Sequence, residues 1–292
     1  MSTVWARCEG AFIGHAIASQ YDPSIFMALN VAESLIQFKE YNGPDILARH
    51  LYLYHTKRCE VGEITKYIYQ AASTSISSRS PTSRETFRFN PTIINGFVQS
   101  AHDKTGGYTA SCGPAQRSYP LAFCANITDD NLVDVAMQEA RLTHQSPIAG
   151  QVAVIVNSIC RSLLRNHNWQ AAVNSAFTQA RLHDDVKNIL MRHGRWPNPL
   201  VETHPAYAPT ILNSVLHYVS ASRSAAEALE LAKYAKNKHY CLPIVGILAG
   251  ARWGVPEDMY RSHMDNLDLT AMRTAANKLI DLWPVSRTDV SV

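Results

Sequence analysis

One segment of the chain has the composition of an anion-binding turn. Gly106–Pro120 is rich in small residues, and a helix is predicted to begin at Pro114. Backbone N–H groups at the start of a helix, here those of Gly113 and Ala115 beside Pro114, attract phosphate. Arg117 would add a guanidinium with two parallel donors. The same residues also fit a flexible loop with an ordinary helix cap, so the spacing alone leaves both interpretations open.

His144 lies at a junction between two predicted helices. Leu142 and Thr143 end one helix, and Pro147 begins the next, which is almost continuously apolar. Imidazole can serve as an acid, a base or a metal ligand. A single histidine in apolar surroundings is more often held by hydrogen bonds within the core. The sequence favours that structural interpretation for His144.

Two apolar segments carry glycines four residues apart. The pairs are Gly10 with Gly14 near the N-terminus and Gly246 with Gly250. Residues four apart lie on the same face of a helix, and glycine there lets another backbone approach closely. The pattern predicts two helices that cross at short distance, which is an inference about packing and does not by itself indicate an activity.

These segments must be positioned by helices, because apolar residues recur at helical spacing along the chain and no convincing strand alternates. We predict an all-α fold with a single domain over residues 1–292. The predicted helices occupy 24–41, 45–56, 61–72, a segment capped by 128–130, 147–164, 169–192 (one or two helices), 211–220, 224–237, 242–252 and 267–282. Residues 73–90 are rich in Ser, Thr and Pro and predict an exposed loop.

The composition excludes several classes of protein. The 292 residues are 46% hydrophobic and 17% charged, a balance typical of globular domains. A net charge of +3 is too small to predict nucleic-acid binding. No uncharged apolar run of about 18 residues predicts a membrane span, and the first residues do not resemble a secretory signal. The six cysteines lack metal-binding or redox spacing, so we expect reduced thiols in a cytoplasmic or nuclear protein.

Taken together and in order, four segments resemble the ADP-ribosylglycohydrolase family. They are Gly10–Ala18, Gly113–Leu121, Leu142–His144 and Val245–Gly254, and the resemblance covers nearly the whole chain. Within the family, Ser111–Pro120 looks closest to the J1-crystallin and selenoprotein J branch. The resemblance implies a compact all-α fold with a cleft for an ADP-ribose-type ligand. The ligand-binding positions that it implies are Gly113, Pro114, Ala115, Arg117, His144 and Tyr240.

This chain departs from the family pattern at the metal site. The family holds a pair of Mg²⁺ ions with carboxylates from the first, second and last motif segments. The first position is His15 here, the second is Pro23–Ile25 with Asp22 just before it, and the last is Asn237–Tyr240. Mg²⁺ needs hard oxygen ligands in near-octahedral geometry, and Lys238 would repel it. We therefore expect no metal and no other cofactor.

Other residues are weak substitutes for the missing carboxylates. The adjacent pairs Asp129–Asp130 and Asp184–Asp185 fit a helix cap and a polar helix face. His15 and His239 replace two of the family's ligands and could bind a transition metal such as Zn²⁺. No third strong ligand accompanies them in the motif segments, which makes a zinc site the less favoured interpretation.

Two functions follow from the resemblance and its departures. In the first, the chain is a non-catalytic relative that binds an ADP-ribose-type ligand without metal, or has a structural role as J1-crystallins do. In the second, it hydrolyses ADP-ribosyl glycosidic bonds with little or no metal dependence. Asp22 or Glu33 would then work with His15 or His239 as acid and base. We expect the first, with no membrane or nucleic-acid partner. A helical interaction scaffold would rest on the all-α class alone.

Overall fold

The described part of the chain is built from helices. The computed structural model describes residues 4–20, 22–56, 61–76, 83–191, 205–264, 269–281 and 283. Over these residues every regular element is a helix, and the single β-type contact is an isolated bridge between Ser111 and Tyr207. The predicted all-α class is confirmed, and the buried hydrophobic side chains form one core cluster.

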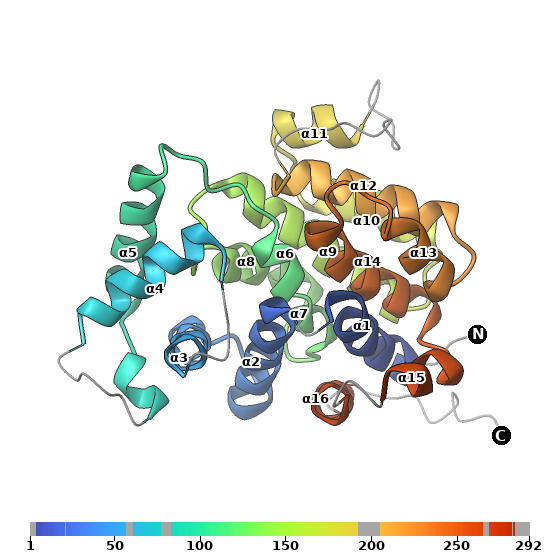
Figure 1. Ribbon diagram of the computed structural model, residues 1–292, viewed down its shortest axis with the longest axis horizontal. Coiled ribbons are helices and arrows are strands. Elements are labelled where there is room, and N and C mark those ends of the chain that lie inside the picture. The colour runs from blue at the N-terminus through green and yellow to red at the C-terminus, as the bar shows by residue number, and fades with distance from the viewer. Residues whose placement is uncertain are drawn as a thin grey trace.

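The helices pack around a central region that contains α9 (Pro147–Leu164), as Figure 1 shows. In chain order they are α1 (Val4–Ser19), α2 (Pro23–Phe38), α3 (Gly43–His55), α4 (Glu63–Thr74), the 3₁₀ helix η1 (Arg84–Phe87), α5 (Pro91–Lys104), α6 (Gly113–Arg117), α7 (Pro120–Phe123), α8 (Asp129–Ala140), α9 (Pro147–Leu164), α10 (Trp169–Gln179), α11 (Asp184–Leu190), α12 (Ala208–Ala221), α13 (Ala225–Ala232), α14 (Lys238–Trp253), α15 (Glu257–Met264) and α16 (Thr270–Ile280).

Local sequence signals explain where several helices begin. The side chains of Asp22, Asn42 and Asn90 cap α2, α3 and α5 by accepting a hydrogen bond from a backbone N–H of the first turn. Each of these helices also has proline in its first two positions. Proline is favoured there because the first N–H groups of a helix have no intrahelical acceptor.

The glycine pairs cross as their spacing predicts. Gly10 lies against Gly250, and Gly14 lies against Gly246, so that α1 and α14 touch backbone to backbone. A Cβ atom added to any of these glycines would collide with the opposite helix. The close approach fixes the C-terminal end of α1 beside the N-terminal half of α14.

Helix α9 is the core helix of the protein. It is long and apolar enough to span a membrane by length and composition, yet 83% of that stretch is buried inside the protein. Its neighbours α6, α8, α10, α12 and α14 pack around it. Burial on most sides is typical of a central helix that is hydrophobic all round.

The predicted exposed loop at 73–90 is wrong in part. Helix α4 continues to Thr74, and η1 forms within the segment. Phe87 is fully buried and packs against the ring of His55, 4.9 Å away. An aromatic side chain at the end of the polar stretch thus anchors it to α3; residues 77–82 lie outside the described part of the chain.

Candidate functional site

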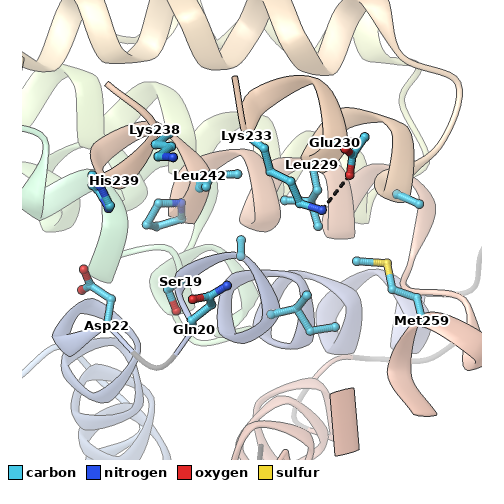
Figure 2. A pocket seen from close by; sticks show the side chains of 14 residues that line it. Ser19, Gln20, Asp22, Leu229, Glu230, Lys233, Lys238, His239, Leu242 and Met259 are labelled. Atoms are coloured by element: carbon cyan, nitrogen blue, oxygen red, sulfur yellow. Dashed lines mark hydrogen bonds and ion pairs between the residues drawn. The ribbon is translucent and has the colours of Figure 1, made fainter. Parts of the chain in front are cut away.

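A cavity opens between the C-terminal end of α1 and helices α13, α14 and α15 (Figure 2). Its volume is about 560 Å³, within the range of roughly 300–1,000 Å³ that is usual for small-molecule sites. The residues that line it are Ile17, Ala18, Ser19, Gln20, Asp22, Ala226, Leu229, Glu230, Lys233, Lys238, His239, Leu242, Pro243 and Met259.

Asp22 is held in place by the tight connection between α1 and α2. Gln20 has a left-handed backbone with φ of 49°, and the Asp22 N–H donates to the carbonyl of Ser19 at 3.0 Å. As the cap of α2, Asp22 accepts a hydrogen bond from the Ser24 N–H through Oδ1 at 2.7 Å. The positive end of the helix dipole also favours a carboxylate at this position. Asp22 therefore lines the cavity with one carboxylate oxygen already bonded to the first turn of α2.

Lys238 and His239 come from the first turn of α14, and both are exposed. The predicted helix began at Leu242, but the observed helix starts four residues earlier and contains Pro243. A proline inside a helix lacks the N–H that would bond the carbonyl four residues back, here that of His239. In Figure 2, Lys238 and His239 lie on one side of the polar end of the cavity, and Asp22 faces them from the other.

The rim of the cavity next to α13 carries an ion pair. The Lys233 ammonium lies 2.6 Å from Oε2 of Glu230, and both side chains are more than half exposed. Such an exposed pair contributes little to stability, typically about 0.2–1 kcal/mol. Because Glu230 offsets Lys233, the unpaired charges of the lining side chains are Lys238 and Asp22.

The segments that carry the sequence motifs converge beside this cavity. His15 of α1 bonds Ser24 of α2, and the Gln116 amide of α6 donates to the carbonyl of Tyr240 in α14 at 3.0 Å. Cys112, just before α6, is buried. Burial raises the pKa of its thiol to about 12, and the negative charge of Asp22 adds to that shift. These contacts bring the motif segments of α1, α2, α6 and α14 together.

His15, a predicted acid or base, is inside the core and does not line the cavity. Its side chain is fully buried, with Nε2 2.9 Å from the Ser24 hydroxyl and Nδ1 3.3 Å from the Tyr119 hydroxyl. Burial lowers the pKa of His15 to about 3. The imidazole is therefore neutral at physiological pH, and it positions Ser24 at the start of α2.

His144 has the structural role that the sequence favours. It is buried, with Nε2 2.6 Å from the Ser111 hydroxyl and Nδ1 2.7 Å from the Thr143 hydroxyl. Burial, with the positive charge of Arg117 adding to it, lowers the pKa of His144 to about 3. Ser111 also forms the bridge to Tyr207, so this trio ties the segment before α6 to the start of α9 and of α12.

Arg117 is not placed to bind a ligand. Its side chain is buried, and Nε donates to Oε1 of Glu139 at 2.7 Å while an Nη donates to the Glu139 carbonyl at 3.2 Å. A buried guanidinium without a carboxylate would be far too costly, and the sequence contains no signal near Arg117 that points to Glu139. We therefore leave Arg117 out of the site.

The other predicted ligand-binding positions are only partly accessible. Pro114 and Ala115 are buried, Gly113 is half-buried against His144, and Tyr240 is 40% exposed. None of them lines the cavity of about 560 Å³. Of all the predicted site residues, Asp22 and His239 are the ones that the cavity brings together. Sequence analysis missed the walls from α13 and α15, which contain no motif.

The residues present do not fit the Mg²⁺ pair that the resemblance implies. His15 is neutral and bonded to hydroxyl groups, and Glu230 is already paired with Lys233. Asp22 is accompanied by Lys238, whose charge opposes a cation. Within the described ranges, no group of three or more His, Cys, Asp or Glu side chains could hold a metal ion. We therefore assign no chemistry at this cavity to Mg²⁺.

Comparisons with known proteins place the chain in a family. A model of the ADP-ribosylglycohydrolase family matches residues 9–288. A solved structure described as an ADP-ribosylglycohydrolase-related protein complex is similar with a TM-score of 0.68 and 21% identity, over 97% of this chain and 99% of that one. No curated protein matches. At that identity the structural likeness supports the fold alone, but the family model spans almost the entire length, and the chain belongs to the ADP-ribosylglycohydrolase family.

Proposed function

We propose that this protein binds an ADP-ribose-type ligand in the cavity between α1, α13 and α14, without metal and without hydrolysing it. The observation that carries the proposal is the charge of the lining. A cavity remains open beside the motif segments, and of the carboxylates among its described lining residues, Glu230 is paired with Lys233 and Asp22 is not paired with a lysine. A dimetal site would need several carboxylates there.

The polar end of the cavity suits a ribose phosphate. The Asp22 carboxylate accepts hydrogen bonds, and its Oδ2 is not used by the cap, which engages Oδ1. Vicinal sugar hydroxyls are donors of the right kind. Lys238 and His239 on the facing side donate to phosphate oxygens. Exposed charges of this kind are screened by salt, so affinity should fall as ionic strength rises.

Hydrolysis would need groups that this arrangement lacks. Cleavage of a glycosidic bond uses paired carboxylates on either side of the bond, one as acid and the other as base or nucleophile. Among the described residues that line the cavity, no second unpaired carboxylate faces Asp22. Glu33, another predicted base, lies on α2 in an ion pair with Arg49 at 2.7 Å. The predicted partner His15 is buried and neutral.

The test is a calorimetric titration with ADP-ribose at low and high salt, with and without Mg²⁺. We expect binding that Mg²⁺ does not change and that weakens at high salt. Lys238→Glu should reduce affinity about 10- to 100-fold, since hydrogen bonds to charged groups contribute about 1.5–3 kcal/mol. Lys66→Glu makes the same charge change on an exposed residue of α4, a helix that lies far from α13 and α15 in Figure 1, and should leave affinity unchanged.

Two results would overturn the proposal in different ways. Absence of any heat of binding at millimolar ADP-ribose would favour a structural role like that of J1-crystallins. A purely structural protein would be expected to have this cleft packed with side chains such as those of His15, Tyr240 and Trp253, and none of these three lines the open cavity. Binding that depends on Mg²⁺ would show that a metal site assembles from residues that we have not assigned.

The metal-independent hydrolase is a second candidate, because Asp22 and His239 both line the cavity. Its test is release of ADP-ribose from an ADP-ribosylated peptide in the presence of a chelator. Turnover that Asp22→Asn abolishes would establish it. Asparagine caps helices about as well as aspartate, so this variant removes the negative charge and keeps the start of α2.

A further inference from the structure

The cavity has two chemically different ends. Figure 2 shows Asp22, Lys238 and His239 together at one end, and Leu229 and Met259 at the other. The second end lies between the C-terminal turn of α1, the face of α13 and the start of α15. It reaches beyond the motif segments that the family resemblance rests on.

The second end has aliphatic side chains beside the Lys233–Glu230 ion pair. Figure 2 shows Leu229 and Met259 there and Leu242 between the two ends, and Ala226 lies one turn from Leu229 on the same face of α13. Among the lining residues that the structure describes, none is Phe, Tyr or Trp. A flat aromatic base is usually held by stacking on an aromatic ring, whereas alkyl groups are held by area of contact with aliphatic side chains and methionine.

From this division we propose that the cavity takes an amphipathic ligand: a phosphate ester whose phosphate lies at the Lys238 end and whose aliphatic group extends to the Leu229–Met259 end. The proposal rests on the proposed function in its placement of the phosphate. It adds a subsite for an aliphatic substituent, which ADP-ribose itself does not have.

Charge and polarity fix the orientation of the ligand. Lys238 is the unpaired cation of the lining, and it lies in the same part of the cavity as His239. At the other end the nearest charges, Lys233 and Glu230, neutralise each other at 2.6 Å. A phosphate is therefore expected beside Lys238 and His239, across the cavity from Asp22, rather than beside Lys233, whose charge Glu230 already offsets. The second end offers an alkyl chain the side chains of Leu229 and Met259 beside a pair of charges that is neutral as a whole.

The experiment measures the affinity of inorganic phosphate and of ethyl, butyl and hexyl phosphate by calorimetry. We expect affinity to rise with chain length by about two- to fourfold per CH₂, because complete burial of one CH₂ corresponds to roughly fourfold. Inorganic phosphate serves as the reference for the head group alone. A flat series, with affinity equal for all alkyl lengths, would overturn the proposal.

A matched pair of variants locates the alkyl chain. Ala226 and Ala271 are both exposed alanines at the second position of a helix, α13 and α16, but only Ala226 lines the cavity. Ala226→Glu should abolish the rise with chain length, and Ala271→Glu should preserve it. An undiminished rise in Ala226→Glu would place the chain elsewhere and refute the subsite.

The same measurements separate this inference from the proposed function. A rise with chain length together with no response to ADP-ribose would support the aliphatic subsite and reject the ADP-ribose-type ligand. Binding of ADP-ribose together with an affinity for alkyl phosphates that does not change with chain length would support the ADP-ribose-type ligand and reject the aliphatic subsite. Lys238→Glu should lower the affinity of every alkyl phosphate by the same factor, because it acts on the head group; a loss confined to the long chains would contradict the proposed orientation.

Discussion

Acidification should destabilise this protein through its buried histidines. His15, His50 and His144 are each no more than 2% exposed, and burial lowers the pKa of all three. For His15 and His144 the pKa falls from 6.5 to about 3. These groups stay neutral in the folded protein but become charged in the unfolded chain, so stability is full above pH 6.5 and is lost as the pH falls toward 3.

The size of the effect follows from linkage. About pH 5.5 is one unit below the histidine pKa in the unfolded chain. At that pH, each histidine that stays unprotonated in the folded protein lowers the free energy of unfolding by about 1.4 kcal/mol. His15 and His144 together then lower the free energy of unfolding by about 3 kcal/mol, a large share of the roughly 5–15 kcal/mol that is typical of folded proteins. Burial raises the pKa of Glu139 above its ordinary value of 4.5, so this residue acts in the opposite sense: between its raised folded pKa and 4.5 the folded protein holds a proton that the unfolded chain releases, and its contribution to stability grows as the pH falls.

Urea unfolding at a series of pH values measures the loss. His15→Asn should remove one histidine's share of the pH dependence, because asparagine does not titrate. The control His217→Asn changes an exposed residue of α12 and should retain the full dependence. The reasoning fails if NMR shows the His15 or His144 ring titrating near pH 6.5 in the folded protein, since the proton would then be accepted without unfolding.

Two further predictions concern packing and a buried ion pair. Gly250→Ala should destabilise the fold by about 3 kcal/mol, at the upper end for overpacking, because the added Cβ meets the backbone of Gly10. Gly96→Ala should stabilise the fold by about 0.5–1 kcal/mol, because no atom lies within 4 Å of the added Cβ. Thermal unfolding of the two variants measures this difference. Arg117→Met should cost about 3–5 kcal/mol because it leaves Glu139 buried without its partner; failure of the double replacement with Glu139→Leu to restore stability would argue against this cause.

The helical class could be predicted from the sequence because its signals are local. Helical spacing of apolar residues and caps such as Asp22 and Asn42 act within one or two turns, and the structure places α2 and α3 close to the expected ranges. The spacing of Gly10 and Gly14 even predicted a close helix crossing, since only a backbone approach needs the absence of Cβ at both positions. In the structure, the glycine faces of α1 and α14 meet, since they have no side chains to keep the two backbones apart.

The site could be predicted only in part from the sequence. Asp22 and His239 were expected near each other through the family motifs, and both line the cavity. Arg117 and His144 have the residue types of a ligand site, but their partners Glu139 and Ser111 lie 22 and 33 residues away. Whether a polar side chain faces a cavity or a buried partner depends on such distant contacts, which no local pattern encodes.

The sequence by itself therefore determined the helices and the glycine crossing, because residue type and short-range spacing are sufficient for both. Tertiary structure alone decided that His15 is neutral, that Arg117 is committed to Glu139, and that Leu229 and Met259 extend the cavity. The physical reason is desolvation: whether a side chain keeps its charge and its contact with water is set by the atoms that the whole fold packs around it.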